Sequence, residues 1–144
     1  MASGQRVRAK MIEHAFDDQT GVLMIALHGM VKGREFSKLT CALFRARPDM
    51  FEYYCIVDLS DYQGDISYSD MNPLQEMFAE RPQPGGVVRP AWIVTPDANF
   101  HFWAAALDAQ LPGRTHHVVP SLDDAFAGIA DQRMADARDG RTVL

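Results

Sequence analysis

Residues 53–60 read YYCIVDLS, and this stretch decides the fold because it holds a short apolar strand that ends in an acid. The run over residues 53–58 is rich in β-branched and aromatic residues, which predicts a strand ending at Asp58. The next residues, LSDYQGDISYSD at positions 59–70, are mostly polar. The sequence therefore predicts a buried strand followed by a polar loop, which we call the 58–70 segment.

Two strands and a helix are predicted upstream of this strand. Residues 7–11 alternate between apolar and charged, and residues 12–16 continue extended, so we expect a strand with one solvated face. Residues 22–28 are apolar on both faces, which predicts an interior strand. The turn DDQTG at residues 17–21 is short enough to make the two strands an antiparallel hairpin. A helix is predicted over residues 33–46, with Phe36, Leu39, Leu43 and Phe44 on its core face.

Helices and strands alternate downstream of the 58–70 segment. A helix over residues 71–78 is signalled by Asn72 as a cap and Pro73 in the first turn. Residues 81–90 are rich in Pro and Gly and predict an irregular loop. Strands are expected over residues 91–95 and 116–119, with a helix following Asp97 between them. Ser121 and Asp124 form a capping box for a last helix.

The predicted order is β-β-α-β-α-β-α-β-α, which defines an α/β fold. Helical crossovers imply parallel pairing of the later strands. We expect a single-domain mixed five-stranded sheet, with an opening antiparallel hairpin and then parallel strands, flanked by four helices. The domain is expected to span residues 6–133, followed by a polar C-terminal tail at 134–144.

Composition excludes several classes of protein. The chain carries 14 basic and 19 acidic residues, a net charge of −5, which disfavours nucleic acid as a partner. The longest apolar run, residues 22–27, is far shorter than the roughly 20 residues that a membrane span requires. No secretion signal is evident at residues 1–6, and two cysteines do not make a disulfide framework, so a cytoplasmic location is expected.

The 58–70 segment is the richest candidate site. Loops at the carboxyl ends of parallel strands carry function unusually often, and Thr95, Asp97 and Ser121 should lie at the same side of the sheet. The alternative is a polar connection whose acids and hydroxyls only cap and turn. The residues expected to form a partner or ligand surface are Asp58, Ser60, Asp61, Asp65, Ser67 and Ser69.

Catalytic and metal-binding constellations are not evident in the sequence. The five histidines lack partners at ligand spacing, so no metal or other cofactor is expected. No nucleophile elbow or phosphate-binding glycine loop is present. Helical spacing places Cys41 on the polar face beside Arg34 and Arg45. Cationic neighbours of this kind lower the pKa of a thiol, so one interpretation is a redox role for Cys41, and the other is that the cysteine lies near the arginines without a function. Cys55 is expected to be inert packing.

One helix face suggests association. Phe102 projects opposite the predicted core stripe of its helix, on a face that includes Ala105 and Ala106. A large aromatic residue on a flat alanine surface suits a homodimer or another partner contact. The alternative is a lone exposed aromatic residue, or one covered by the Pro/Gly loop.

The chain resembles STAS-type domains, and more narrowly their SpoIIAA-like branch, which consists of small bacterial proteins that often stand alone. The resemblance is carried by the opening hairpin and by short stretches at the ends of the later strands. These stretches are YYCIVDLS at residues 53–60, WIVTPD at residues 92–97 and VVPSLDDAF at residues 118–126.

The resemblance implies a non-enzymatic regulatory domain that acts through protein–protein contact. In anti-sigma antagonists of the superfamily, a Ser at the start of the helix after the third strand accepts phosphate. Ser67 and Ser69 lie at about that position, but the Asp-Ser-Ser-Gly run of the family is absent. The branch is also compared with lipid-transfer domains, which implies as an alternative a carrier or sensor of a small apolar ligand. A hydrolase that uses Asp58 or Asp97 is the weakest alternative.

Overall fold

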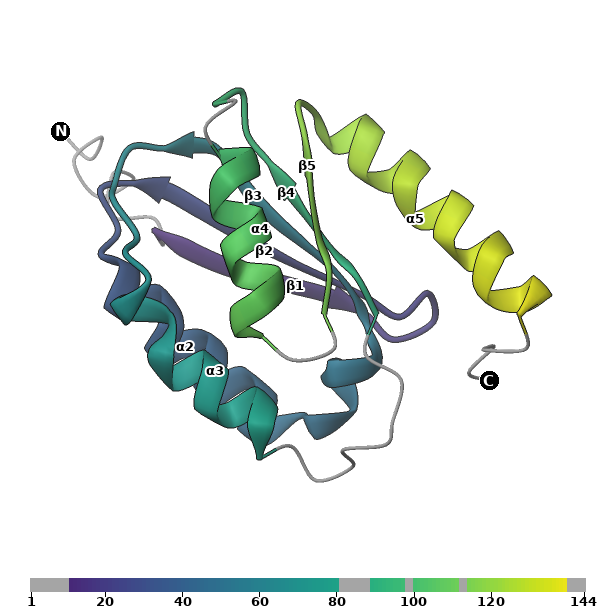
Figure 1. Ribbon diagram of the computed structural model, residues 1–144, viewed down its shortest axis with the longest axis horizontal. Helices are drawn as coiled ribbons and strands as arrows, with labels where there is room; N and C mark the ends of the chain where they lie inside the picture. The colour runs from purple at the N-terminus through teal and green to yellow at the C-terminus, as the bar shows by residue number, and fades with distance from the viewer. Residues whose placement is uncertain (1–10, 81–88, 98–99, 112–113, 140–144) are drawn as a thin grey trace, which may run out of the picture.

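The computed structural model describes residues 11–80, 89–97, 100–111 and 114–139. Within them the elements follow the predicted order, which confirms the α/β fold class (Figure 1). The elements are β1 Ile12–Asp17, β2 Val22–Gly29, α2 Gly33–Ala46, η1 Pro48–Glu52, β3 Tyr54–Tyr62, η2 Ser69–Met71, α3 Asn72–Ala79, β4 Ala91–Val94, α4 Phe100–Gln110, β5 His116–Val119 and α5 Leu122–Arg138.

The predicted opening hairpin is confirmed, because β1 and β2 pair antiparallel from Ile12↔Leu27 to Asp17↔Val22. Asp17 begins the turn by accepting a hydrogen bond from the backbone N–H of Gln19 at 2.9 Å. Gly21 ends the turn with φ of 65°, a conformation that costs glycine little. The part of the first strand that was expected over residues 7–10 lies outside the described residues.

The sheet has the strand order β1-β2-β3-β4-β5. β2, β3, β4 and β5 are parallel to one another, so β2 is the interior strand that its apolar sequence predicted. β1 and β5 are the two edges. The chain thus crosses the sheet in sequence order, and each helical connection returns it to the same end.

We call the side of the sheet that packs against α2, α3 and α4 the front face. Leu23, Ile25 and Leu27 of β2 are at most 1% exposed there. Phe44 of α2 and Phe78 of α3 have ring centroids 5.9 Å apart, and Phe51 of η1 lies 4.9 and 5.1 Å from them. This aromatic cluster joins two helices and the short turn η1 into one core.

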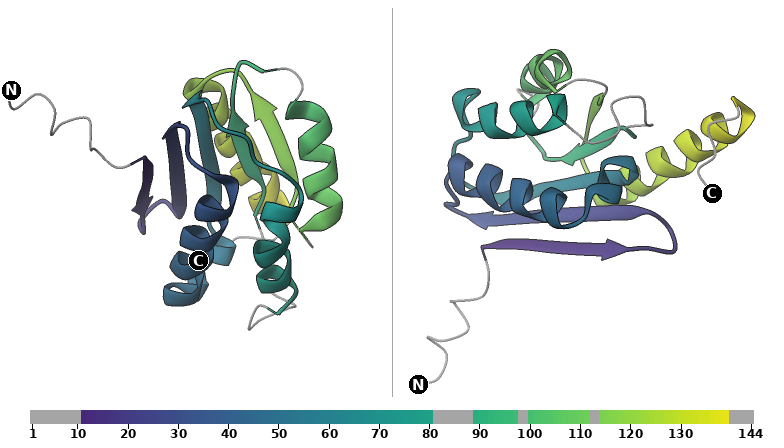
Figure 2. Two further views of the ribbon diagram at one scale, coloured as in Figure 1. Left: turned by 90° about the vertical axis from the view of Figure 1, so that its left-hand side faces the viewer. Right: turned by 90° about the horizontal axis from the view of Figure 1, so that it is seen from below.

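We call the opposite side the back face. α5 packs there on Tyr54, Ile56, Trp92 and Val94 and lies apart from the other three helices (Figures 1 and 2). The predicted cap is confirmed, because the Ser121 hydroxyl accepts a hydrogen bond from the Asp124 N–H at 3.1 Å.

The helix α5 continues into the segment expected as a polar tail. It runs to Arg138, and Asp136 is only 3% exposed. Its carboxylate accepts hydrogen bonds at 2.7 Å from the Tyr54 hydroxyl and from the Arg89 guanidinium. Residues 134–138 are therefore attached to the sheet by a buried ion pair.

Two local predictions about helices are wrong. Asn72 is the first residue of α3 and not its cap, because η2 leads directly into the helix. Leu39 is 46% exposed although it was assigned to the core face of α2. The predicted Pro/Gly loop lies mostly at residues 81–88, outside the described residues.

Candidate functional site

The 58–70 segment is not a single loop. β3 was expected to end at Asp58, but it continues to Tyr62 and includes the first five residues of the segment. The prediction was wrong because β2 is long enough to pair with these residues through Ala26↔Asp58, His28↔Asp61 and Gly29↔Tyr62. The polar side chains of residues 58–61 therefore belong to a sheet surface.

A β-bulge places Asp58 and Asp61 on the same face. Side chains of a regular strand alternate, so residues three apart should point to opposite faces. The register shifts by one residue between Ala26 and His28, where two residues of β3 face one residue of β2. Leu59 remains buried at 4% exposure, while Ser60 and Asp61 are exposed.

His28 organises the polar groups beside this bulge. Its Nδ1 lies 3.0 Å from an Asp61 oxygen, and its Nε2 lies 3.0 Å from a Glu13 oxygen. Both ring nitrogens donate only when the imidazole is protonated. The carboxylates of Glu13 and Asp61 accordingly raise the pKa of His28 above its ordinary value, against a smaller opposing effect of burial.

We call Glu13, His28, Asp58, Ser60 and Asp61 the back-face cluster. It joins β1, β2 and β3 across the sheet, and Asp58 accepts hydrogen bonds from the Ser60 N–H at 3.0 Å and from the Ser60 hydroxyl. Sequence reasoning selected Asp58, Ser60 and Asp61 but missed Glu13 and His28. The strand pairing was needed to find them, because they lie 33 and more residues away from Asp61 in the chain.

The later part of the segment forms a separate turn. Asp70 accepts a hydrogen bond from the Ser67 N–H at 3.0 Å and donates its own N–H to the Ser67 hydroxyl at 3.2 Å. The hydroxyls of Ser67 and Ser69 are 3.0 Å apart. This reciprocal pair of hydrogen bonds leads into η2. It agrees with the alternative prediction that the acids and hydroxyls of the segment serve as caps and turns. Asp65, Ser67 and Ser69 are exposed, and their role in binding remains a prediction.

The carboxyl ends of β4 and β5 lie side by side as expected. Asp58 pairs with Val94, and the next residue, Thr95, donates its N–H to the Val119 carbonyl at 3.0 Å. The Thr95 hydroxyl accepts a hydrogen bond from the Asp97 N–H at 3.1 Å. Thr95 is buried and serves a local turn. Asp97 is exposed, so this end of the sheet carries an acid after β4 as well as the exposed groups of β3 and its following loop.

The cysteine prediction needs a correction. Cys41 is 2% exposed and not on the polar face of α2. The buried side of this helix is wider than the predicted stripe, because α3 packs alongside α2 and covers Ser37 and Cys41 as well. Burial raises the pKa of the Cys41 thiol, and the smaller effect of Arg45 does not reverse this. A thiol in this setting is not activated for redox chemistry. Cys55 is buried, as expected.

The predicted association face is only partly described. Ala105 is exposed and Ala106 is half-buried on α4, whereas the side chain of Phe102 lies outside the described residues. In the described part of the chain, no three His, Cys, Asp or Glu residues could together hold a metal ion. No described helix has the length and apolar character needed to cross a membrane.

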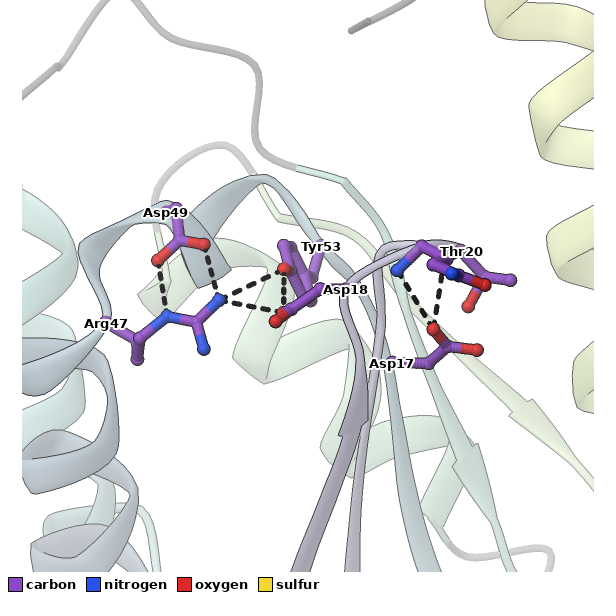
Figure 3. Close-up of polar contacts among 7 residues, drawn as sticks. Asp17, Asp18, Thr20, Arg47, Asp49 and Tyr53 are labelled. Atoms are coloured by element: carbon purple, nitrogen blue, oxygen red, sulfur yellow. Dashed lines mark hydrogen bonds and ion pairs between the residues drawn. The ribbon is translucent and has the colours of Figure 1, made fainter.

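A second polar cluster, which the sequence did not reveal, lies at the opposite end of the sheet (Figure 3). Arg47 contacts Asp18 at 2.8 Å and binds both carboxylate oxygens of Asp49 at 3.0 and 2.8 Å. Tyr53 donates its hydroxyl to Asp18, and with Arg47 it lowers the pKa of that carboxyl. Burial and the Asp18 carboxylate raise the pKa of Tyr53 to about 12. The cluster fastens the hairpin turn to η1.

Comparison with known proteins places the fold. No family model matches the chain, and no curated protein matches it. It is similar to an uncharacterised protein of the DUF3478 family with a SpoIIAA-like fold from Shewanella loihica PV-4. That match has 13% identity and a TM-score of 0.57 and covers 81% of this chain and 90% of the other. An anti-sigma factor antagonist from Mycobacterium paratuberculosis matches with 19% identity and a TM-score of 0.48, over 83% of this chain and 95% of the other. The chain thus has the SpoIIAA-like fold that its sequence suggested.

Proposed function

We propose that this protein is a non-enzymatic regulatory domain that binds another protein through the back-face cluster. The observation that carries the proposal is an open, charged area on the back face, beside the area that α5 covers. Leu122, Ala125 and Ile129 of α5 pack over Tyr54 and Ile56 in the first half of β3. Asp61, in the second half, keeps 73% of its side chain exposed, and Glu13 keeps 55%.

The charge of the cluster favours a basic partner. Glu13, Asp58 and Asp61 supply three carboxylates against one imidazolium, a formal charge of −2 when His28 is protonated. Acidic surfaces of this kind steer association with basic partners and select against acidic ones. The His28 contacts hold two of the carboxylates in place before binding, which reduces the entropic cost of ordering them.

Site-specific photo-crosslinking in the native host tests the proposal. A photo-reactive amino acid at position 60 should yield a crosslink to one defined protein, and the same residue at position 131 on α5 should not. Asp131 is a suitable control because it is an exposed acid at a distant place on the fold. Asp61→Arg should abolish the crosslink while Asp131→Arg preserves it. Equal loss in both variants, or no crosslink from position 60, contradicts the proposal.

The Asp65, Ser67 and Ser69 side chains would extend this surface toward α3. A phosphate on Ser67 would compete with the Asp70 carboxylate for the Ser67 N–H and would repel it. We therefore favour Ser69 over Ser67 as a position where a phosphate could be accommodated. Ser69→Glu should weaken the crosslink from position 60 if the two parts of the segment contact one partner.

The second candidate function, a carrier of a small apolar ligand, is supported by a cavity of about 60 Å³ on the front face. Its lining includes Phe36, Ile66, Leu74 and Ile93, with His116 at one side. Burial lowers the pKa of His116 to about 4, so this ring is neutral near pH 7. A cavity of about 150 Å³ binds benzene, so this smaller cavity suits a smaller apolar group and not a lipid chain.

Native mass spectrometry of protein purified from its own host distinguishes the two candidates. A retained small apolar adduct would favour the carrier, and a lipid-sized adduct would in addition require the cavity to expand. Protein without an adduct that still forms the crosslink from position 60 would favour the regulator. Homodimer formation, predicted from the Phe102 face, would appear in the same spectrum as a doubled mass.

A further inference from the structure

A cleft of about 480 Å³, lined mainly by residues of polar and charged types, lies at the amino ends of the parallel strands, opposite the end where the 58–70 segment lies. Its volume falls within the range of roughly 300–1,000 Å³ that is usual for small-molecule sites. One wall is formed by the hairpin turn and η1, and the other by the last turns of α5. The residues that the argument uses are Asp18, Glu52, Tyr54, Arg89, Arg133 and Asp136.

Both walls are fixed by hydrogen bonds that do not require a ligand. Arg47 ties Asp18 of the turn to Asp49 of η1, which holds the first wall (Figure 3). On the other side, Asp136 accepts hydrogen bonds from Arg89 and Tyr54. Arg89 is 4% exposed and Asp136 3%. A cleft with walls fixed in this way is preorganised for binding.

Two charged side chains remain after these pairs are made, one on each wall. Glu52 is half-buried on η1, and Arg133 is half-buried on α5. Arg133 stacks over the Tyr54 ring, 5.1 Å from its centroid, and donates one hydrogen bond to the Thr20 carbonyl. Within the described part of the chain, neither Glu52 nor Arg133 forms an ion pair. The guanidinium has five N–H donors, so most of them remain for other acceptors.

We propose that the cleft binds a small zwitterion of the amino-acid type, with its ammonium group toward Glu52 and its carboxylate toward Arg133. A ligand of one sign would place its charge beside a like charge on one of the walls, whereas a zwitterion compensates both. The planar fork of Arg133 also suits a carboxylate, which it can bind through two parallel hydrogen bonds. This inference goes beyond the proposed protein-binding function and concerns the other end of the sheet.

Titrations of the full-length protein followed by ¹H–¹⁵N NMR test the ligand class. The probes are free glycine, leucine, glutamate, lysine and phenylalanine, followed by the N-acetyl and the carboxamide derivatives of the tightest binder. We expect at least one free amino acid to shift, in a saturable way, the amide signals of residues 18–21, 52–54 and 133–137. Each blocked derivative should bind at least about tenfold more weakly, which corresponds to the loss of one charged contact. Failure of all five probes, or equal binding of the blocked forms, overturns the proposal.

Variants assign the two ends of the ligand. In Arg133→Gln, the free amino acid should bind no more tightly than its carboxamide. In Glu52→Gln, the free amino acid should bind no more tightly than its N-acetyl form. Arg133→Lys should restore part of the tighter binding of the free amino acid over its carboxamide, because it retains the positive charge. Arg138→Gln, at an exposed arginine of the same helix, should leave both ratios unchanged. These ratios compare ligands on the same variant, so a general loss of stability does not imitate the result. Unchanged ratios in Arg133→Gln and Glu52→Gln contradict the assignment.

Discussion

The front face of the sheet packs against α2, α3 and α4, whereas the back face packs against α5 over only part of its area. On the front, apolar side chains such as Ile25 and Leu27 are almost fully buried. On the back, the same strands present Glu13, His28 and Asp61 beside the α5 contact. The difference shows that one strand, β2, can contribute apolar side chains to the core on one side and a polar side chain to the open surface on the other, because side chains alternate along each strand.

The largest expected effect comes from the ion pair that fastens the end of α5 to the back face. Asp136→Ala would leave Arg89 buried with its charge uncompensated by this carboxylate. We expect a loss of about 3–5 kcal/mol in the free energy of unfolding, measured by urea denaturation. Asp131→Ala on the exposed side of α5 is the control and should change it by less than about 0.5 kcal/mol. Similar effects of the two variants would mean that the end of α5 does not need this pair.

A front-face substitution should have the next largest effect. Ile25 is 1% exposed, and Ile25→Ala removes three buried carbon atoms from beneath the helices. We expect a loss of about 2–4 kcal/mol in the same measurement. Ala15→Ser, at an exposed position of the neighbouring β1, should be close to neutral. If both substitutions lowered the free energy of unfolding to a similar extent, the covered and the open areas of the sheet would not differ in their contribution to stability.

The fit of α5 against the sheet can be tested at one glycine. A Cβ added at Gly128 would lie 2.3 Å from Nε1 of Trp92, a buried side chain with little freedom to move. Gly128→Ala should therefore lower stability by about 1–3 kcal/mol, although alanine favours a helix. Gly128→Ala should cost less in a Trp92→Phe background than in the wild type, because the shorter ring relieves the contact. A stabilising effect of the single change would show that α5 can shift on the back face.

The smallest expected effect concerns His28 on the open area. Because its pKa is raised in the folded state, protonated His28 stabilises the fold below the ordinary histidine pKa of 6.5, and this contribution is lost as pH rises through the folded pKa. The stability difference between the wild type and His28→Gln should thus be larger at pH 6 than at pH 9. Solvent screening at this exposed site limits it to less than about 1 kcal/mol. NMR titration of the ring should give a pKa above the ordinary histidine value of 6.5, and a pKa below that value would contradict the bridging geometry.

The arrangement of elements could be predicted because the signals were local. The turn at residues 17–21, the interior character of β2 and the capping box at Ser121 each depend on adjacent residues, and each is confirmed. The placement of Cys41 failed because its burial depends on α3, an element that begins 31 residues further along the chain. Periodicity within a single helix does not reveal how many neighbours cover it.

The candidate site was only partly predictable for a related reason. Asp58, Ser60 and Asp61 could be selected from local polarity, but their grouping with Glu13 and His28 requires the register of three strands. A register change of one residue reverses which face every later side chain occupies. The bulge makes such a change within β3. The prediction ended this strand at Asp58, so it did not include the residues where the register changes.

The bulge also determines which insertions and deletions the surface can tolerate. Removal of Ser60 would restore a continuous register, in which Leu59 faces Leu27 and Asp61 still faces His28. A chain that is one residue shorter here could therefore present the same acid to the same histidine. Among homologous chains, we expect alignment gaps within β3 to concentrate at positions 59–60, and the spacing between Asp58 and Asp61 to vary by one residue while both acids are retained.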